Sequence, residues 1–413
     1  DLAASTIAGF NGSPAVSGKY DVWSAYGELS VPLLADLPFA QSVTLDLAGR
    51  LSDYSTAGKA DAFKIGGNWT VNDDIRFRGN YNTTVRAPSV TDLFSPQGQN
   101  FPGAQDPCSA NANQAITAAI SALCIATGVP VANVGTNLIN TVSGQVPALA
   151  GGNPDLDVET GDTWTVGAVY TPSFVEGLTL SVDYYDITIE DIIGSISAQE
   201  ALDLCYVNAS TGGVGSQFCN LVTRQADGQI NTLTLTSQNS AEATNRGVDV
   251  AATYTVETAD FFGSDFGSVA LRYLGTFNLE NDFLSNPAAD IITCAGEFGN
   301  TCGEPDAEYR HRVSGIWNTD SFSTQLVWRL VGEVEDDLGI GGGSSVDSID
   351  TFNYFDGSTT WDVNDNLAFT FGINNIFAEE PPILGDNQEQ ANTYPATYDV
   401  FGRTFFLNAK TRF

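Results

Sequence analysis

A chain of 413 residues is long enough for one large domain or for two or three ordinary ones. Its formal charge of -34 excludes a nucleic-acid-binding protein, because such proteins present a basic surface to phosphates. No stretch approaches the roughly 18 uninterrupted apolar residues of a membrane-spanning helix. The mean hydropathy of -0.05 fits a membrane β-barrel and a soluble β-sandwich equally well, so composition does not separate these two.

The dominant pattern along the chain is an alternation of apolar and polar residues, which is typical of β-strands with two different faces. In Asp74–Arg86 one face carries Ile75, Phe77, Tyr81 and Val85, whereas the other is polar and cationic. Similar stripes predict strands, in chain order, over Val22–Leu33, Val43–Tyr54, Ala62–Val71, Asp74–Arg86, Thr163–Thr171, Leu178–Glu190, Gly247–Glu257, Ser268–Leu279, Tyr309–Asn318, Phe322–Glu333, Phe352–Val363, Asn366–Phe377 and from near Val400 to Phe413.

The length of these strands decides between the two β architectures. There are about thirteen of them, most roughly 10 to 13 residues long, whereas strands of globular proteins usually have about 5–6 residues. A strand that crosses a membrane needs about 9–11 residues. The pattern therefore predicts an all-β fold, a transmembrane antiparallel β-barrel. An odd number of strands does not close the usual even-numbered barrel, so we expect further strands to be supplied from outside this chain.

The connections between the strands alternate between short turns and long loops, which is typical of bacterial outer-membrane barrels with their long loops on the cell exterior. Within the loops, Asn113–Cys124 and Ala198–Cys205 are expected to be helical, and Ile230–Leu235 is expected to be a strand above the membrane. The predicted extracellular loops are residues 87–159, 192–244, 281–307, 336–349 and 378–399.

All six cysteines fall in these long loops and form three close couples in the sequence. Six cysteines allow 15 pairings, but proximity favours Cys108 with Cys124, Cys205 with Cys219, and Cys294 with Cys302. None of the spacings matches a C-x-x-C metal or redox motif. We therefore expect three local disulfides that staple loops in an oxidising compartment.

Six segments resemble the C-terminal half of TonB-dependent outer-membrane receptors. They occur in the order of that family over roughly 330 residues. The segments are NYNTTVRAPSVTDLF (80–94), GGNPDLDVETGDTWTVGAVYTP (151–172), GLTLSVDYYDITIEDII (177–193), NRGVDVAATY (245–254), GINNIFAEEPP (372–382) and YDVFGRTFFLNAKTRF (398–413).

The resemblance implies a barrel of about 22 strands that is filled by an N-terminal plug domain. No plug segment is recognisable in this chain, so the plug and the remaining barrel strands are expected partners. The resemblance further implies energy coupling through the TonB–ExbB–ExbD complex and active uptake of a siderophore, cobalamin or glycan. It implies no enzymatic activity and no cofactor.

Two sets of residues are candidates for contacts with other parts of the system. The alternating apolar end of the chain, with Phe405, Leu407 and Phe413, resembles the signal that the barrel-assembly machinery recognises. Arg76, Arg78 and Arg86 share the polar face of one strand. An Arg facing mid-bilayer lipid costs about 2–4 kcal/mol. We therefore expect these side chains to face the lumen, where they contact either acidic groups of the plug or local partners in a hydrated wall.

Metal sites have little support in the sequence. His311 is the only histidine, which argues against a zinc site and against a Ser-His-Asp catalytic system. Glu335, Asp336 and Asp337 are weak calcium candidates at a loop tip, but no EF-hand spacing accompanies them. Solvated loop charge is the plainer interpretation of these residues.

Two alternatives to active transport remain at this stage. A passive porin or a structural outer-membrane barrel would have the same strand pattern and lack a plug. A secreted soluble β-protein, such as an adhesin or a lectin, would stack its apolar stripes between two sheets instead of facing outer-membrane lipid with them.

Overall fold

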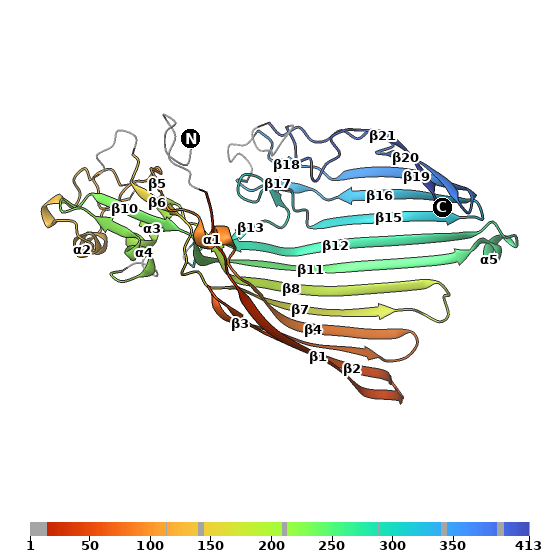
Figure 1. Cartoon of the computed structure of the whole chain (residues 1–413). Coiled ribbons are helices and arrows are strands. Elements are labelled where there is room, and N and C mark those ends of the chain that lie inside the picture. Colours follow the sequence, from red (N-terminus) through yellow and green to blue (C-terminus); the bar gives the residue numbers. More distant parts are fainter. Residues whose placement is uncertain are drawn as a thin grey trace.

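A computed structural model describes residues 15–112, 114–138, 144–208, 213–287, 289–339, 345–385 and 392–412. One large antiparallel sheet dominates it, in which consecutive long strands pair as neighbours (Figure 1). Its path is β1 (Val22–Leu37), β2 (Ala40–Tyr54), β3 (Gly58–Thr70), β4 (Ile75–Arg86), β7 (Glu159–Tyr170), β8 (Leu178–Gly194), β11 (Gln238–Glu257), β12 (Ser268–Leu284), β15 (Tyr309–Asn318), β16 (Phe322–Val331), β19 (Phe352–Asn364), β20 (Leu367–Asn374) and β21 (Thr404–Thr411).

The predicted strands are confirmed, because each strand of this path overlaps one of the thirteen segments with period-two alternation. The observed boundaries of several strands differ from the predicted ones. β11 begins at Gln238 instead of Gly247, and β12 ends at Leu284 instead of Leu279. The residues in these extensions are mostly polar on both faces, so they carry no alternation. The two extensions nevertheless pair with each other, and that of β11 also pairs with β8 as far as Gly194. The strands therefore enter the segments 192–244 and 281–307 that were expected to be loops.

The connections separate to the two ends of the sheet, as Figure 1 shows. One end has only short links, and the longest of them contains the helix α5 (Thr258–Phe262). The other end has one short turn, between β2 and β3, and five long segments. Among the described residues, no helix has the length and apolar character needed to cross a membrane.

The long segments build their own small sheets. One has the order β5 (Gly98–Asn100), β6 (Ala148–Gly151), β10 (Ile230–Thr236) and β9 (Val222–Arg224). The predicted strand at Ile230–Leu235 therefore exists, but it pairs in parallel with β6 and not with the large sheet. The other small sheet consists of β14 (Glu297–Phe298), β17 (Val334–Asp336) and β18 (Ser348–Ile349), and the two-residue β13 (Ile292–Thr293) pairs with β12.

Helices in the long segments begin at side-chain caps. The expected helix at Asn113–Cys124 is α2 (Ala118–Ala126), because the hydroxyl of Thr117 accepts the backbone N–H of Ile120 and fixes the start. The helix α3 (Ala198–Tyr206) begins where expected, after a capping box formed by Ser197 and Glu200. The remaining helices of this end are α1 (Val90–Phe94), the short 3-10 turn Val131–Asn133 and α4 (Gln217–Asn220).

The described residues have two buried cores, and both lie in the long connecting segments and the strand ends beside them. The first packs β6, β9, β10 and helices α2, α3 and α4 around residues such as Leu202, Phe218 and Leu233. The second gathers Phe298 and Tyr354 with residues from β17, β18 and the segment before β21. The large sheet, in contrast, leaves most of its big apolar side chains exposed on one face.

Candidate functional site

The two faces of the large sheet differ in chemistry. On β16 the even positions Phe322, Leu326 and Trp328 are exposed, whereas Gln325 and Arg329 take the opposite face. Soluble monomers rarely expose a continuous apolar patch of more than a few hundred Å². The exposed side chains of this apolar face include Leu29, Leu51, Phe63, Ile65, Trp69, Phe77, Trp164, Val166, Val182, Leu271, Phe277, Trp317, Phe371 and Leu407.

Aromatic side chains cluster at both borders of this apolar face. At the short-turn end the indole N–H of Trp317 donates to the carbonyl of Phe266 at 2.9 Å, and Phe322 stacks on Trp361 with centroids 6.3 Å apart. Six residues up the strand from Trp317, the ring of His311 lies 4.3 Å from that of Trp328. Six residues of a strand span about 20 Å, so the two aromatic borders are separated by nearly the height of the apolar band of outer-membrane barrels, which is about 25 Å.

The polar face carries an ion pair that crosses a whole strand. Arg78 on β4, Gly167 on β7 and Asp183 on β8 share one row of the register. The Arg78 Nε donates to Asp183 Oδ1 at 2.7 Å across the glycine. A Cβ on Gly167 would lie 1.9 Å from that same oxygen. The missing side chain of Gly167 therefore makes the contact between Arg78 and Asp183 possible.

The other two predicted lumen arginines behave differently from Arg78. Arg86 is the direct cross-strand partner of Glu159 and pairs with its carboxylate, which also accepts the backbone N–H of Ile193 at 2.9 Å. Arg76 makes no ion pair within the described part of the chain. Two of the three arginines thus pair with carboxylates of the same sheet, and contact of any of them with a plug stays a prediction.

A second charged group on the polar face was not found from the sequence. Arg329 on β16 donates to Asp356 on β19 at 2.8 Å and to Asp399 at 2.6 Å, and its guanidinium lies 4.9 Å from the centroid of the Tyr354 ring. The register neighbour of Arg329 is Arg312 on β15. The two arginines and the two aspartates line a depression of about 460 Å³. Asp399 is separated by 70 residues from Arg329, so no local pattern could join them.

We call the first loop core, with β5, β6, β9, β10 and α2 to α4, the disulfide domain. The predicted pairs Cys108–Cys124 and Cys205–Cys219 are both bonded there, and all four cysteines are buried. The third predicted pair, Cys294–Cys302, is also bonded and lies in the other loop cluster. No free cysteine occurs among the described residues.

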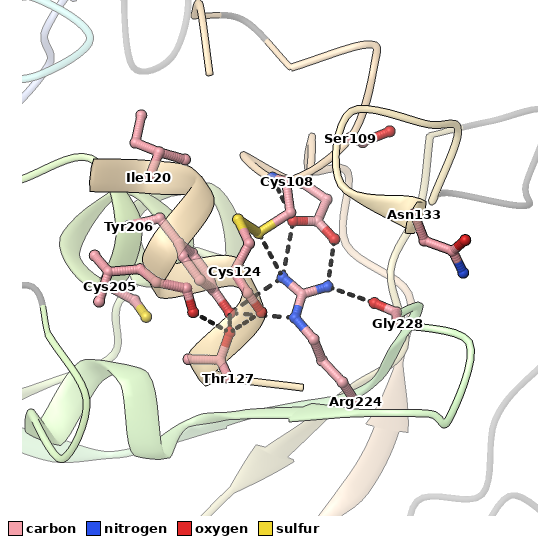
Figure 2. The surroundings of a disulfide bond; sticks show 12 residues. Cys108, Ser109, Ile120, Cys124, Thr127, Asn133, Cys205, Tyr206, Arg224 and Gly228 are labelled. Atoms are coloured by element: carbon pink, nitrogen blue, oxygen red, sulfur yellow. Dashed lines mark hydrogen bonds and ion pairs between the residues drawn. A yellow bond between two sulfur atoms is a disulfide. The ribbon is translucent and has the colours of Figure 1, made fainter. Parts of the chain in front are cut away.

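A buried ion pair lies beside the first disulfide of the disulfide domain (Figure 2). The guanidinium of Arg224 donates to Asp106 Oδ2 at 2.6 Å and to Asp106 Oδ1 at 2.9 Å, and it also reaches the Tyr206 hydroxyl and the Gly228 carbonyl. Both charged side chains are fully buried. Burial lowers the pKa of Arg224, but the hydrogen bonds and charge of Asp106 outweigh it and raise that pKa above its ordinary value.

The second loop cluster contains the calcium candidates. The Asp337 Oδ2 accepts the backbone N–H groups of Thr301 and Cys302 at 2.6 and 2.8 Å, so this carboxylate ties β17 to the loop closed by the third disulfide. Asp336 is buried, and its Oδ1 accepts the N–H of Leu338. In the described ranges no group of three or more His, Cys, Asp or Glu side chains could hold a metal ion. Asp336 and Asp337 therefore make hydrogen bonds that support the loop fold, and calcium binding by Glu335, Asp336 and Asp337 stays a prediction.

An apolar outward face bordered by aromatic rings, a polar opposite face and long loops at one end together define the wall of an outer-membrane β-barrel. The family described as "TonB dependent receptor-like, beta-barrel" matches residues 2–376, and the chain belongs to this family. No curated protein sequence matches the chain.

Solved structures of similar fold include two siderophore receptors. The ferric enterobactin receptor PfeA from Pseudomonas aeruginosa superposes with a TM-score of 0.61 at 16% identity, over 99% of this chain and 47% of that chain. The siderophore receptor PirA from Acinetobacter baumannii gives a TM-score of 0.59 at 15% identity, over 95% of this chain and 46% of that one. The chain thus spans about half the length of these structures, and the likeness concerns the fold.

Proposed function

We propose that the chain is part of a TonB-dependent receptor that actively imports a scarce nutrient, of the siderophore, cobalamin or glycan class, across the bacterial outer membrane. The family match over residues 2–376 is the observation that carries this proposal. The polar face supports it, because paired charges such as Arg78–Asp183 and Arg329–Asp356 suit a hydrated interior. The receptor performs no chemistry on its ligand in this account.

The rest of the barrel and a plug are the first partners that we propose. In the described residues β1 and β21 form the two edges of the large sheet, and unpaired strand edges are not tolerated in lipid. The missing strands would pair with both edges and close the barrel. Acidic groups of the plug would then meet Arg76, whose side chain has no ion-pair partner in the described part of the chain, and also Arg78 and Arg86.

The orientation follows from the loops. Outer-membrane barrels have short periplasmic turns and long extracellular loops, so we propose that the end with the five long segments and the three disulfides faces the cell exterior. The short turns would then face the periplasm, where TonB–ExbB–ExbD acts. Phe405 and Leu407 are strongly exposed on the apolar face of β21, which suits recognition by the barrel-assembly machinery. Phe413, the third residue of this predicted signal, lies outside the described residues.

Growth and uptake in the native bacterium test the proposal. Strains that lack this gene or lack TonB would be compared on iron chelates, cobalamin and oligosaccharides as limiting nutrients, with and without a protonophore. We expect uptake of one nutrient class to fail in both mutants and after protonophore treatment. Uptake that needs the gene but continues without TonB and with the protonophore would indicate a passive pore and overturn the proposal.

A further inference from the structure

A cavity of about 700 Å³ opens on the disulfide domain beside α3, outside the polar face of the sheet. Its polar lining comes from three separate segments, and apart from Ser197 it consists of carboxylates and carboxamides. The residues concerned are Gln114, Gln199, Glu200, Asp203, Asn208 and Asn286. A cavity of this size is in the range that encloses small ligands, about 300–1,000 Å³.

Most of these polar groups are held in place by one another. The Glu200 Oε1 accepts Ser285 Oγ at 3.1 Å and the side-chain amide of Asn286. The Gln199 Nε2 donates to Asp203 Oδ1 at 3.0 Å. The lining is therefore a fixed array, which lowers the entropy cost of binding a ligand.

Two groups of the array retain hydrogen-bonding capacity. The Gln114 Nε2 is buried and has no partner among the described residues, so it is a donor that needs an acceptor. The Asp203 Oδ2 makes no hydrogen bond in the described part of the chain. Burial raises the pKa of the Asp203 carboxyl. A ligand that carries both hydrogen-bond acceptors and donors would satisfy the two groups.

The charge of the surrounding loops restricts the ligand further. Residues 87–159, 192–244, 281–307, 336–349 and 378–399 contain 22 Asp and Glu residues but one basic residue, Arg224. That residue is fully buried against Asp106, so these loops present no exposed cation. An anionic ligand would meet a negative potential without a counter-charge.

We propose that this cavity binds a neutral, hydroxyl-rich ligand, namely a segment of a glycan. The hydroxyls of a glycan can accept from Gln114 Nε2 and donate to Asp203, whereas an ammonium group has only donors and cannot satisfy the amide. Metal ions lack a suitable group of ligands in the described residues. The inference rests on the proposed uptake function and names the substrate class of its outer capture site.

Binding to the full-length receptor in detergent tests the inference. The probes are neutral oligosaccharides of glucan and xylan type, ferric enterobactin as an anion and spermidine as a cation. We expect a neutral oligosaccharide to bind, and we expect Gln114→Ala and Asp203→Ala each to raise its dissociation constant about tenfold. Asp290→Asn removes one exposed loop charge outside the cavity lining and is the matched control, which should bind as the unmodified receptor does.

Intact disulfides and unchanged hydrogen exchange in α3 would establish that the variants are folded. Absence of binding to every neutral oligosaccharide, equal binding by all variants, or displacement of the sugar by ferric enterobactin or spermidine would overturn the inference. Loss of TonB dependence in cells would refute the proposed function instead, since binding in detergent requires no energy coupling.

Discussion

Gly167 shows how the absence of a side chain positions a charged pair. Gly167→Ala would place a methyl group 1.9 Å from Asp183 Oδ1, so Asp183 must move away from Arg78. We expect the free energy of unfolding of the assembled receptor in micelles to fall by about 1–3 kcal/mol. Denaturant titration followed by tryptophan fluorescence measures this change.

Gly79→Ala is the matched control, because a Cβ there lies at an ordinary 3.5 Å from the Thr165 carbonyl. In an Asp183→Ala background the carboxylate that collides with the new methyl group is absent. Gly167→Ala should therefore lower the free energy of unfolding by less in that background. If Gly167→Ala lowers the free energy of unfolding equally with and without the Asp183 carboxylate, this explanation of the role of Gly167 is contradicted.

Arg224 provides the second prediction at this scale. Arg224→Ala leaves the Asp106 carboxylate buried without a cation, and breaking a buried pair in this way costs about 3–5 kcal/mol. Hydrogen exchange in α2 and β10 should therefore accelerate by at least about two orders of magnitude. The double variant with Asp106→Ala removes both charges and should recover part of the protection. Unchanged exchange in Arg224→Ala would show that the pair does not hold the domain.

Individual contacts were only partly predictable from the sequence. The three disulfides followed from short spacing, since their partners are separated by 16, 14 and 8 residues. The pairs Arg224–Asp106 and Arg329–Asp399 join residues that are 118 and 70 positions apart. Only the folded loops bring these side chains together. The hydrogen bonds from backbone N–H groups to Asp337 Oδ2 and Asp336 Oδ1 were not predictable either, because a sequence does not show where backbone donors lie.

At the scale of elements, the contact between β14 and β17 should make the stability of the second loop cluster depend on pH. Burial raises the pKa of Glu297 on β14, and the negative charges of Asp337, Glu335 and Asp336 raise it further. The folded cluster therefore binds this proton more tightly than the unfolded loop does. Its stability is highest below the unfolded pKa of about 4.5 and falls as the pH rises through the raised folded value.

Hydrogen exchange of residues 294–302, corrected for intrinsic rates, tests this dependence. We expect protection in that segment to decrease between about pH 4 and the neutral range. Glu297→Gln should remove most of the decrease, because the amide does not titrate. Protection that rises over the same interval in the unmodified protein would contradict the sign of the effect.

Element boundaries were predictable where one face of a strand meets lipid. Tyr309–Asn318 was predicted with both ends as observed. β11 was predicted nine residues short, because Gln238–Arg246 has no apolar stripe. Above the membrane both faces of a strand are exposed to water, so the sequence of this part of β11 resembles that of a loop. Its backbone nevertheless pairs with β8 and β12.

For the whole molecule, the sequence established the all-β architecture more firmly than any single site. The alternation of apolar and polar residues shows which face of the sheet each side chain takes. The strand length shows that the strands can span a membrane, so the large sheet was predictable. The disulfide domain was not, because its short strands come from loops that are distant in the chain and its core has no regular period.

The central claim is that one face of the large sheet lies in hydrocarbon and the other in water. Spin labels placed one at a time along β16 (Phe322–Val331), in the receptor reconstituted in bilayers, test it through collision rates with oxygen and with a water-soluble nickel chelate. We expect oxygen access at Phe322, Thr324, Leu326, Trp328 and Leu330, and protection from oxygen at the odd positions between them. Equal access to the nickel chelate on both faces, with no alternation, would contradict it.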